Sequence, residues 1–190
     1  MSTVIGLTGP TGAGKSSIMP LAEKLGFFTV DCDKVAREES KNKEMLKSLA
    51  NFFGDDIIKN GELCRKTLAQ RAFSSPENTE KLNEITLPFI SAKIMEIIKE
   101  KDKVILDAPT LFESGLHKIC TATVCVLADE NLRKTRIIKR DNLTEYAAKT
   151  RLFAAKTDEF FVSNCDYTVY NNGERDMFLK NAEEILKKFI

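Results

Sequence analysis

A glycine-rich stretch near the start of the chain has the residue types and the spacing to bind a chain of phosphates. Residues 9–16 read GPTGAGKS and match the pattern G-x-x-x-x-G-K-[ST] at every fixed position. Glycines allow backbone angles that turn successive N–H groups inward, and the start of a helix adds positive potential there. Lys15 can then reach the β- and γ-phosphates of ATP, and Ser16 can place its hydroxyl on Mg²⁺. The predicted nucleotide-binding residues are Gly12, Ala13, Gly14, Lys15, Ser16 and Ser17.

Three aspartates at or just after the ends of apolar stretches are candidates for the acceptor and metal side of the chemistry. Asp31 and Asp33 lie in VDCD, and Asp107 ends VILD. A carboxylate there could accept or orient the proton of an attacking hydroxyl, or bind Mg²⁺ directly or through water. We predict that all three bind the acceptor, that Asp33 is catalytic, and that Asp107 and Ser16 are metal ligands. If the strand continues, Asp31 and Asp33 point to the same side.

The alternative interpretation of the three aspartates is structural. Asp31 would cap the following helix, and Asp33 would be a solvated acid in the first helical turn, where negative charge is favourable. Asp107 would be an acid that merely ends a strand.

A strongly basic stretch in the second half of the chain predicts a lid. Residues 131–156 hold eight basic and two acidic side chains, a local charge of +6 in a chain of net charge +1. This balance is typical of a mobile lid that carries arginine over a transferring phosphate. Arg136 and Arg140 share a helix face because they are four residues apart, and they could converge on one phosphate. We predict a lid at about 136–160, with Arg136 binding the nucleotide and Arg140 catalytic; a solvated basic helix face is the alternative.

Other uses of a phosphate loop are disfavoured because their motifs do not occur in the sequence. The stretch NKEM, at 42–45, lacks the aspartate of the guanine-reading N-K-x-D motif. There is also no Asp-x-x-Gly switch after either later strand and no LSGGQ-type signature. A small kinase remains, in which a second substrate accepts the γ-phosphoryl group. The rival hypotheses are a kinase for another small metabolite or a nucleoside monophosphate, and a non-catalytic ATP-binding protein that works by interaction.

The pattern of apolar runs predicts the elements that position these residues. Short, nearly continuous apolar stretches are typical of buried strands in a parallel sheet that is covered on both faces. They lie at 3–8, 27–31, 103–108, 121–128 and 166–171. Helical spacing occurs at 15–25, 43–53, 66–73, 77–101 with a kink or break at Pro88, 130–141 and 175–190. The prediction is one α/β domain over residues 1–190 with an inserted subdomain at about 34–101.

Composition predicts an ordinary globular protein of the cytoplasm. Apolar residues make up 43 % and charged residues 30 % of the 190-residue chain, whose net charge of +1 argues against a nucleic-acid partner. No apolar run approaches the roughly 20 residues that span a bilayer, and the N-terminus lacks signal-peptide features, so we expect no membrane partner. Five cysteines without a C-x-x-C spacing argue against a disulfide framework or a zinc site. We expect a monomer, with an oligomer left open.

The ordered series of motifs resembles the dephospho-CoA kinase family over nearly the whole chain. It comprises GLTGPTGAGKSS, VDCDKVAR, FFGDDIIKNGELCRKTLAQRAF, LNEITLPFI, ILDAPTLFESGL, RIIKRD and CDYTVYNNG. The resemblance implies a P-loop nucleotide-kinase-like three-layer fold with a helical acceptor-binding subdomain and a lid. It also implies transfer of the γ-phosphoryl group of ATP to the ribose 3′-hydroxyl of dephospho-CoA, the last step of coenzyme A biosynthesis.

The resemblance also implies roles for individual residues. Asp33 would be the base or the hydroxyl-orienting acid, Arg65 would lie in the acceptor region, and Arg140 would be a lid arginine. Asn171 and Gly173 would lie near the adenine of ATP.

The chain departs from the usual family pattern at a few positions. Leu87 stands where the family usually has histidine, Arg133 where it has glutamine, and Thr110 where it tends to have leucine. The family also has a glutamine near Ala155. These departures leave open a divergent member, a shifted acceptor or reduced activity.

Overall fold

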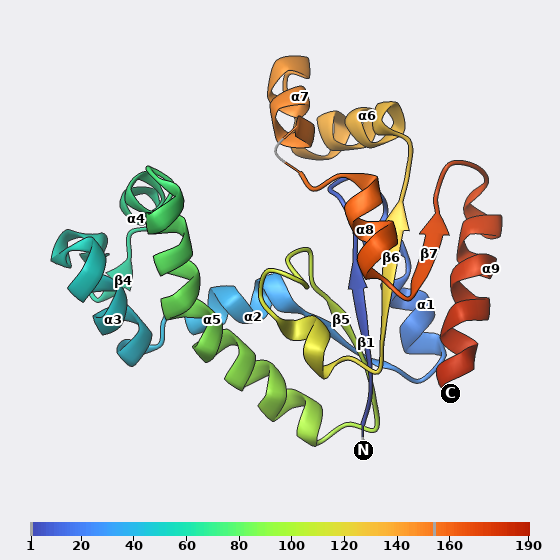
Figure 1. Ribbon diagram of the computed structural model, residues 1–190, viewed down its shortest axis with the longest axis horizontal. Coiled ribbons are helices and arrows are strands. Elements are labelled where there is room, and N and C mark those ends of the chain that lie inside the picture. Colours follow the sequence, from blue (N-terminus) through green and yellow to red (C-terminus); the bar gives the residue numbers. More distant parts are fainter. Residues whose placement is uncertain (1, 154) are drawn as a thin grey trace. The chain divides into compact units, whose positions relative to one another are not determined.

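The centre of the fold is a five-stranded parallel sheet with the strand order β2-β5-β1-β6-β7 (Figure 1). The computed structural model describes residues 2–153 and 155–190. The strands are β1 (Thr3–Thr8), β2 (Phe28–Asp31), β5 (Lys103–Asp107), β6 (Ala122–Leu127) and β7 (Tyr167–Tyr170). Each predicted strand is present to within one residue at either end. The predicted α/β fold class, with five parallel strands, is therefore confirmed.

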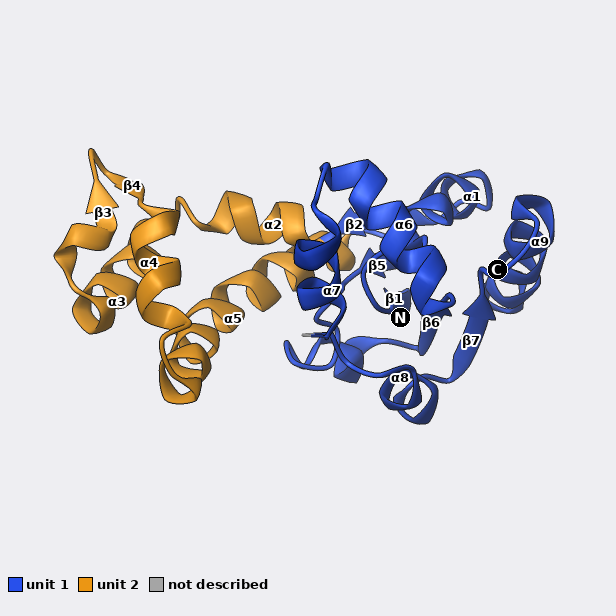
Figure 2. Ribbon diagram, turned by 90° about the horizontal axis from the view of Figure 1, so that it is seen from above, with its two compact units in different colours: residues 1–31, 101–190 blue, residues 32–100 orange. Residues whose placement is uncertain are grey.

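The chain divides into two compact units, residues 1–31 with 101–190 and residues 32–100 (Figure 2). The first unit contains the sheet. Its helices are η1 (Lys15–Ser17), α1 (Met19–Lys24), η3 (Leu116–Ile119), α6 (Glu130–Asp141), α7 (Glu145–Phe153), α8 (Asp158–Asn164), α9 (Arg175–Leu186) and η4 (Lys187–Phe189).

Helices cover both faces of the sheet, and the strand period explains how. In β6, Val124 and Val126 join the core cluster that α1 and α9 close on one face. Cys125 and Leu127 pack instead with Phe161 of α8 on the other face. Alternate residues of a strand point to opposite faces, so a strand that is buried on both sides must be apolar throughout.

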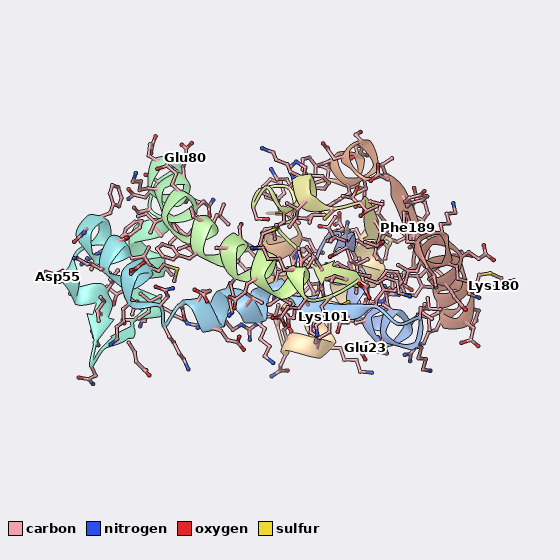
Figure 3. All side chains as sticks on the ribbon, turned by 90° about the horizontal axis from the view of Figure 1, so that it is seen from below. Glu23, Asp55, Glu80, Lys101, Lys180 and Phe189 are labelled. Carbon is pink, nitrogen blue, oxygen red and sulfur yellow. The ribbon has the colours of Figure 1, made fainter. Side chains whose placement is uncertain are left out.

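Aromatic rings lie at both edge strands of the sheet. Phe189, labelled in Figure 3 and in the last turn of the chain, packs edge-on against Tyr167 of β7, with ring centroids 5.8 Å apart. The ammonium of Lys101 lies 4.8 Å from the centroid of the Phe28 ring on β2. Both contacts cover apolar surface next to an edge strand of the sheet.

The second unit is mainly helical and has its own core. Its elements are α2 (Cys32–Glu39), α3 (Lys43–Phe53), η2 (Asp55–Ile57), β3 (Ile58–Lys59), β4 (Glu62–Leu63), α4 (Arg65–Ala72) and α5 (Pro76–Lys99). Met45, Leu49 and Phe53 of α3 pack with Leu68 and Ala72 of α4. Asn42 caps α3 and Ser75 caps α5, each accepting backbone N–H groups of the first turn.

Three local features differ from the sequence-based expectation. The helix expected at 15–25 is divided into η1 and α1, because Pro20 occupies the first turn of α1, where its missing N–H is tolerated. Of the kink or break expected at Pro88, the break does not occur, since α5 runs through the proline, and the kink stays a prediction. Asn60 and Gly61, with φ of 53° and 80°, form the turn of a short hairpin between β3 and β4, two strands that were not predicted.

Within residues 2–153 and 155–190, none of the helices combines the length and the apolar character that crossing a membrane would require.

Candidate active site

The glycine-rich loop connects β1 to η1 at the C-terminal edge of the sheet. Gly9, Gly12 and Gly14 have φ values of 134°, 79° and 105°, which side-chain-bearing residues rarely adopt. The ammonium of Lys15 donates to the carbonyl oxygen of Gly9 at 2.7 Å and lies 3.5 Å from that of Pro10. The lysine is thus held over its own loop, where a bound triphosphate would compete for its three N–H groups.

Two side chains from elsewhere in the first unit hold the carbonyl side of this loop. The guanidinium of Arg136 on α6 donates to the oxygens of Gly12 and Ala13, both at 3.4 Å, and to that of Asn171 at 3.1 Å. The side-chain amide of Asn171, which follows β7, donates to the Ala13 oxygen at 2.7 Å. Gly173, two residues further, is exposed.

Arg140, the other predicted arginine of this helix face, has a different partner from Arg136. Its Nε and Nη2 bind the two carboxylate oxygens of Asp141 at 2.7 and 2.9 Å. Nη1 of Arg151 on α7 binds the same carboxylate at 2.7 Å. The pKa of Asp141 lies below its ordinary value, chiefly because of the hydrogen bond from Arg140. Arg136 and Arg140 therefore contact different groups here, and their convergence on one phosphate stays a prediction.

The ion pairs of Asp141 link α6 to α7 at the protein surface. The side chains of Arg140 and Arg151 are 58 % and 50 % exposed. The Asp141 side chain is 25 % exposed and bonds to both arginines, so Arg140 would have to exchange one anionic partner for another to bind a phosphate. The sequence pointed to Arg140 but not to Asp141 or Arg151 as its neighbours, because nothing in the local spacing indicates which acid the arginines share.

Two of the three predicted aspartates lie side by side at the end of the sheet. The Cα of Asp31 pairs with that of Asp107 across β2 and β5, and Asp107 pairs with Leu7 of β1, two residues before the loop begins. Asp31 is exposed, whereas one carboxylate oxygen of Asp107, Oδ1, is buried. The strand ends therefore bring a carboxylate close in register to the start of the phosphate loop.

Asp33 does not extend the strand, so the condition under which Asp31 and Asp33 would point to the same side is not met. The helix α2 begins at Cys32, immediately after Asp31, and Asp33 is an exposed acid in its first turn. The strand period no longer applies once the chain becomes helical.

Arg65 belongs to the second unit and begins α4. Its Nη2 donates to the hydroxyl oxygen of Ser40, just beyond α2, at 3.2 Å, and the side chain is exposed. Leu87, the departure nearest to the predicted acceptor region, is half-buried in α5.

The described side chains could supply only some of the ligands of Mg²⁺, and phosphate and water would supply the others. In the part of the chain that the structure describes, no three His, Cys, Asp or Glu side chains gather into a potential metal site. Mg²⁺ at kinase sites usually takes one or two protein oxygens, with phosphate and water completing the shell. The Ser16 hydroxyl, exposed at the end of the loop, and the Asp107 carboxylate are oxygen donors of this kind.

Two further contacts lie on α6 and just before it. A Cβ on Gly12 would lie 2.8 Å from the carbonyl oxygen of Arg133, a buried residue of α6. Asn172 accepts from the backbone N–H of Asp129 at 2.8 Å and donates to its carboxylate at 3.0 Å, so this pair joins the segment after β7 to the residue before α6.

Gly12→Ala is expected to weaken ATP binding by about tenfold or more. The new methyl group would strain the backbone and meet Arg133 O at 2.8 Å and Ile137 Cγ2 at 3.0 Å, so that the loop or α6 must shift. Isothermal titration calorimetry measures the loss. Gly61→Ala is the matched control, because its φ is 80° and no described atom beyond its chain neighbours lies within 4 Å of a Cβ there. Equal ATP affinity in the two variants would contradict this role of Gly12.

Comparison with known proteins places this geometry in a family. A family model described as dephospho-CoA kinase matches residues 3–176. A dephospho-CoA kinase of Fusobacterium nucleatum is 34 % identical over 183 residues, 95 % of each chain. One of Enterococcus faecalis is 34 % identical over 196 residues, covering 100 % of this chain and 96 % of the relative. The solved structure of dephospho-CoA kinase from Campylobacter jejuni matches with a TM-score of 0.70 and 26 % identity, over 99 % and 97 % of the two chains.

Proposed function

The chain belongs to the dephospho-CoA kinase family, and from that premise we propose how its residues divide the work of phosphoryl transfer. It is accordingly an ATP-using kinase of coenzyme A biosynthesis. The reaction transfers the γ-phosphoryl group of ATP to the ribose 3′-hydroxyl of dephospho-CoA. The observation that carries the residue assignment is the complete phosphate loop, with Lys15 held at 2.7 Å from the oxygen of Gly9 next to the strand-end aspartates.

The loop and the basic helices form the donor side of the proposed site. Backbone N–H groups of residues 12–17 bind the phosphates, and the Lys15 ammonium moves from the Gly9 oxygen onto the β- and γ-phosphates. The lid covers about residues 136–160, which include α7 and parts of α6 and α8. Residue 154 of this range lies outside the described residues. Arg140, whose side chain is 58 % exposed, leaves Asp141 to neutralise charge on the transferring group, and Arg151 stays paired with the Asp141 carboxylate.

We assign Mg²⁺ to Ser16 and Asp107, on the basis of their oxygen donors and of the position of Asp107 beside β1. Ser16 and Asp107 would hold the ion, which would supply positive charge to stabilise the phosphates. Gly173, exposed after β7, borders the adenine at the C-terminal edge of the sheet, where ligands of such folds collect.

The acceptor side is assigned to Asp31, Asp33, Asp107 and Arg65. The exposed carboxylate of Asp33 orients the 3′-hydroxyl or takes its proton, and the exposed Arg65 offers a fork of N–H donors suited to phosphate groups of the acceptor. The second unit, residues 32–100, would be the acceptor-binding part.

We propose a monomer, with an oligomer left open. Each of the five cysteines, all within the described residues, is a free thiol, which suits the reducing cytoplasm where we expect the enzyme to act.

An acceptor panel tests the proposal. With ATP and Mg²⁺, ADP release should be faster with dephospho-CoA than with AMP, CMP or shikimate by about two orders of magnitude in kcat/KM. A phosphorylated product at the 3′-position, identified by mass spectrometry and NMR, should accompany it. Preference for AMP, CMP or shikimate would favour another small-molecule kinase. Tight ATP binding without turnover on any acceptor would favour a non-catalytic role.

A further inference from the structure

Two side chains, those of Arg136 and Asn171, donate hydrogen bonds to backbone carbonyl oxygens of the phosphate loop. Ala13 O accepts from Nδ2 of Asn171 at 2.7 Å and from Nη1 of Arg136 at 3.4 Å. Arg136 also reaches the oxygens of Gly12, at 3.4 Å, and of Asn171, at 3.1 Å. Three parts of the first unit, the loop, α6 and the segment after β7, are thereby joined by one set of hydrogen bonds.

We propose that Arg136 and Asn171 are positioning residues for the triphosphate, which act by holding the loop carbonyls outward so that the loop N–H groups face the phosphates. This inference rests on the proposed nucleotide site but not on the identity of the acceptor. It differs from the role that the family resemblance implies for Asn171, namely a place near the adenine.

The planarity of the peptide bond is the physical basis of the proposal. In a trans peptide the C=O of one residue and the N–H of the next point in opposite directions. Fixing the oxygen of Ala13 on the outside therefore fixes the N–H of Gly14 toward the inside. Gly14 has φ of 105°, which glycine adopts at little cost but which is only one of the many backbone conformations open to it. The two donors that converge on Ala13 O stabilise this conformation over the others.

The side-chain amide of Asn171 is buried where it donates to the loop. Asn171 is only 8 % exposed, and its own backbone N–H is bonded to Leu127 O at 2.8 Å. Gly14 packs so closely that a Cβ there would overlap Nδ2 of Asn171. A buried amide that gave up the loop to bind a base would leave the Ala13 oxygen with a single long bond, which is costly in a buried setting.

The contacts of Arg136 also tie the loop to the helix that carries Arg140. The α6 backbone lies against Gly12 at Arg133, and Arg136 follows on the next turn. Arg136 therefore fixes the loop with respect to the start of the lid, whereas Arg140, one turn further along, is paired only with Asp141 among the hydrogen bonds described for it.

A comparison of ATP with inorganic tripolyphosphate separates positioning from adenine contact. Tripolyphosphate has the phosphates of ATP but no base. With the full chain and Mg²⁺, Asn171→Ser and Arg136→Lys should each weaken both ligands by about tenfold, or about 1.4 kcal/mol, as measured by calorimetry. Asn172→Ser is the matched control: Asn172 is adjacent and makes two hydrogen bonds of its own, to Asp129. Its affinities for both ligands should equal those of the unmodified protein.

Amide hydrogen exchange provides a second readout without any ligand. The loop peptide containing Gly14 should exchange faster in Asn171→Ser and Arg136→Lys than in Asn172→Ser, at matched thermal unfolding midpoints. The two variants remove the two donors separately, so each can be judged even if the other fails to fold.

Three results would overturn the proposal. Weaker ATP binding with unchanged tripolyphosphate binding would make these residues adenine ligands, and unchanged binding of both ligands would remove them from the nucleotide site altogether. If the unmodified protein bound ATP but not tripolyphosphate, the premise of a preformed phosphate site would be wrong, and with it the proposed role of Arg136 and Asn171. Failure of the acceptor panel alone leaves these outcomes unaffected and concerns the proposed acceptor chemistry.

Discussion

Lys15→Ala is expected to abolish phosphoryl transfer, with kcat reduced by about three orders of magnitude or more, and to leave the fold intact. The ammonium is the charged group held within the loop, 2.7 Å from Gly9 O, and its charge is needed as the γ-phosphoryl group leaves. The buried core of the first unit consists of apolar side chains of the strands, α1 and α9 and does not include Lys15. ADP release measures turnover, and circular dichroism with thermal unfolding measures the fold.

The control for this variant is Lys24→Ala, an exposed lysine in the last turn of α1. It removes the same charge and the same methylene groups from a neighbouring helix. Its turnover should stay within about twofold of the unmodified enzyme, as expected for an exposed surface residue. Transfer by Lys15→Ala at a rate within tenfold of the unmodified protein would contradict the role of Lys15.

Asp33→Asn is expected to lower turnover by about 10²- to 10⁴-fold while changing ATP affinity only slightly. The substitution keeps the size of the side chain but removes the negative charge that orients or deprotonates the 3′-hydroxyl. Asp33 is exposed in the first turn of α2, so the variant should fold normally. Steady-state kcat with dephospho-CoA and calorimetric ATP affinity are the two measurements.

Glu38→Gln, an exposed acid on the same helix, controls for the loss of one negative charge from α2. Unchanged turnover in Asp33→Asn would remove Asp33 from the mechanism. A loss of ATP affinity as large as the loss of turnover would instead assign the carboxylate to the nucleotide or to its metal ion.

Several predictions came from the sequence because they depend on residues that are near one another in the chain. The phosphate loop follows from the spacing of two glycines, a lysine and a serine, and the five strands follow from short apolar runs. Local backbone preference and side-chain period suffice for such features. The hairpin of β3 and β4 was not predicted, because its two-residue strands are too short to show a period.

The sequence left alternatives open at two places where the local pattern is ambiguous. The strand ending at Asp31 passes directly into α2, so Asp33 lies in the first helical turn, as the structural alternative placed it, and not in a continued strand. The helix α5 continues through Pro88. Proline weakens a helix, but Ile85 and Phe89 in the adjacent turns pack on the core of the second unit and stabilise α5.

The sequence by itself determined that this protein binds a nucleotide through a phosphate loop on a parallel sheet, because each of those features is written in short-range spacing. Only the tertiary structure decided what Arg136 and Asn171 do. They lie 123 and 158 residues from Ala13 along the chain, yet both donate to its carbonyl oxygen. The tertiary structure also places Asp31 next to Asp107 and brings Asp141 into contact with both Arg140 and Arg151. Such pairings depend on which strands are neighbours and how helices pack, and no local pattern encodes them.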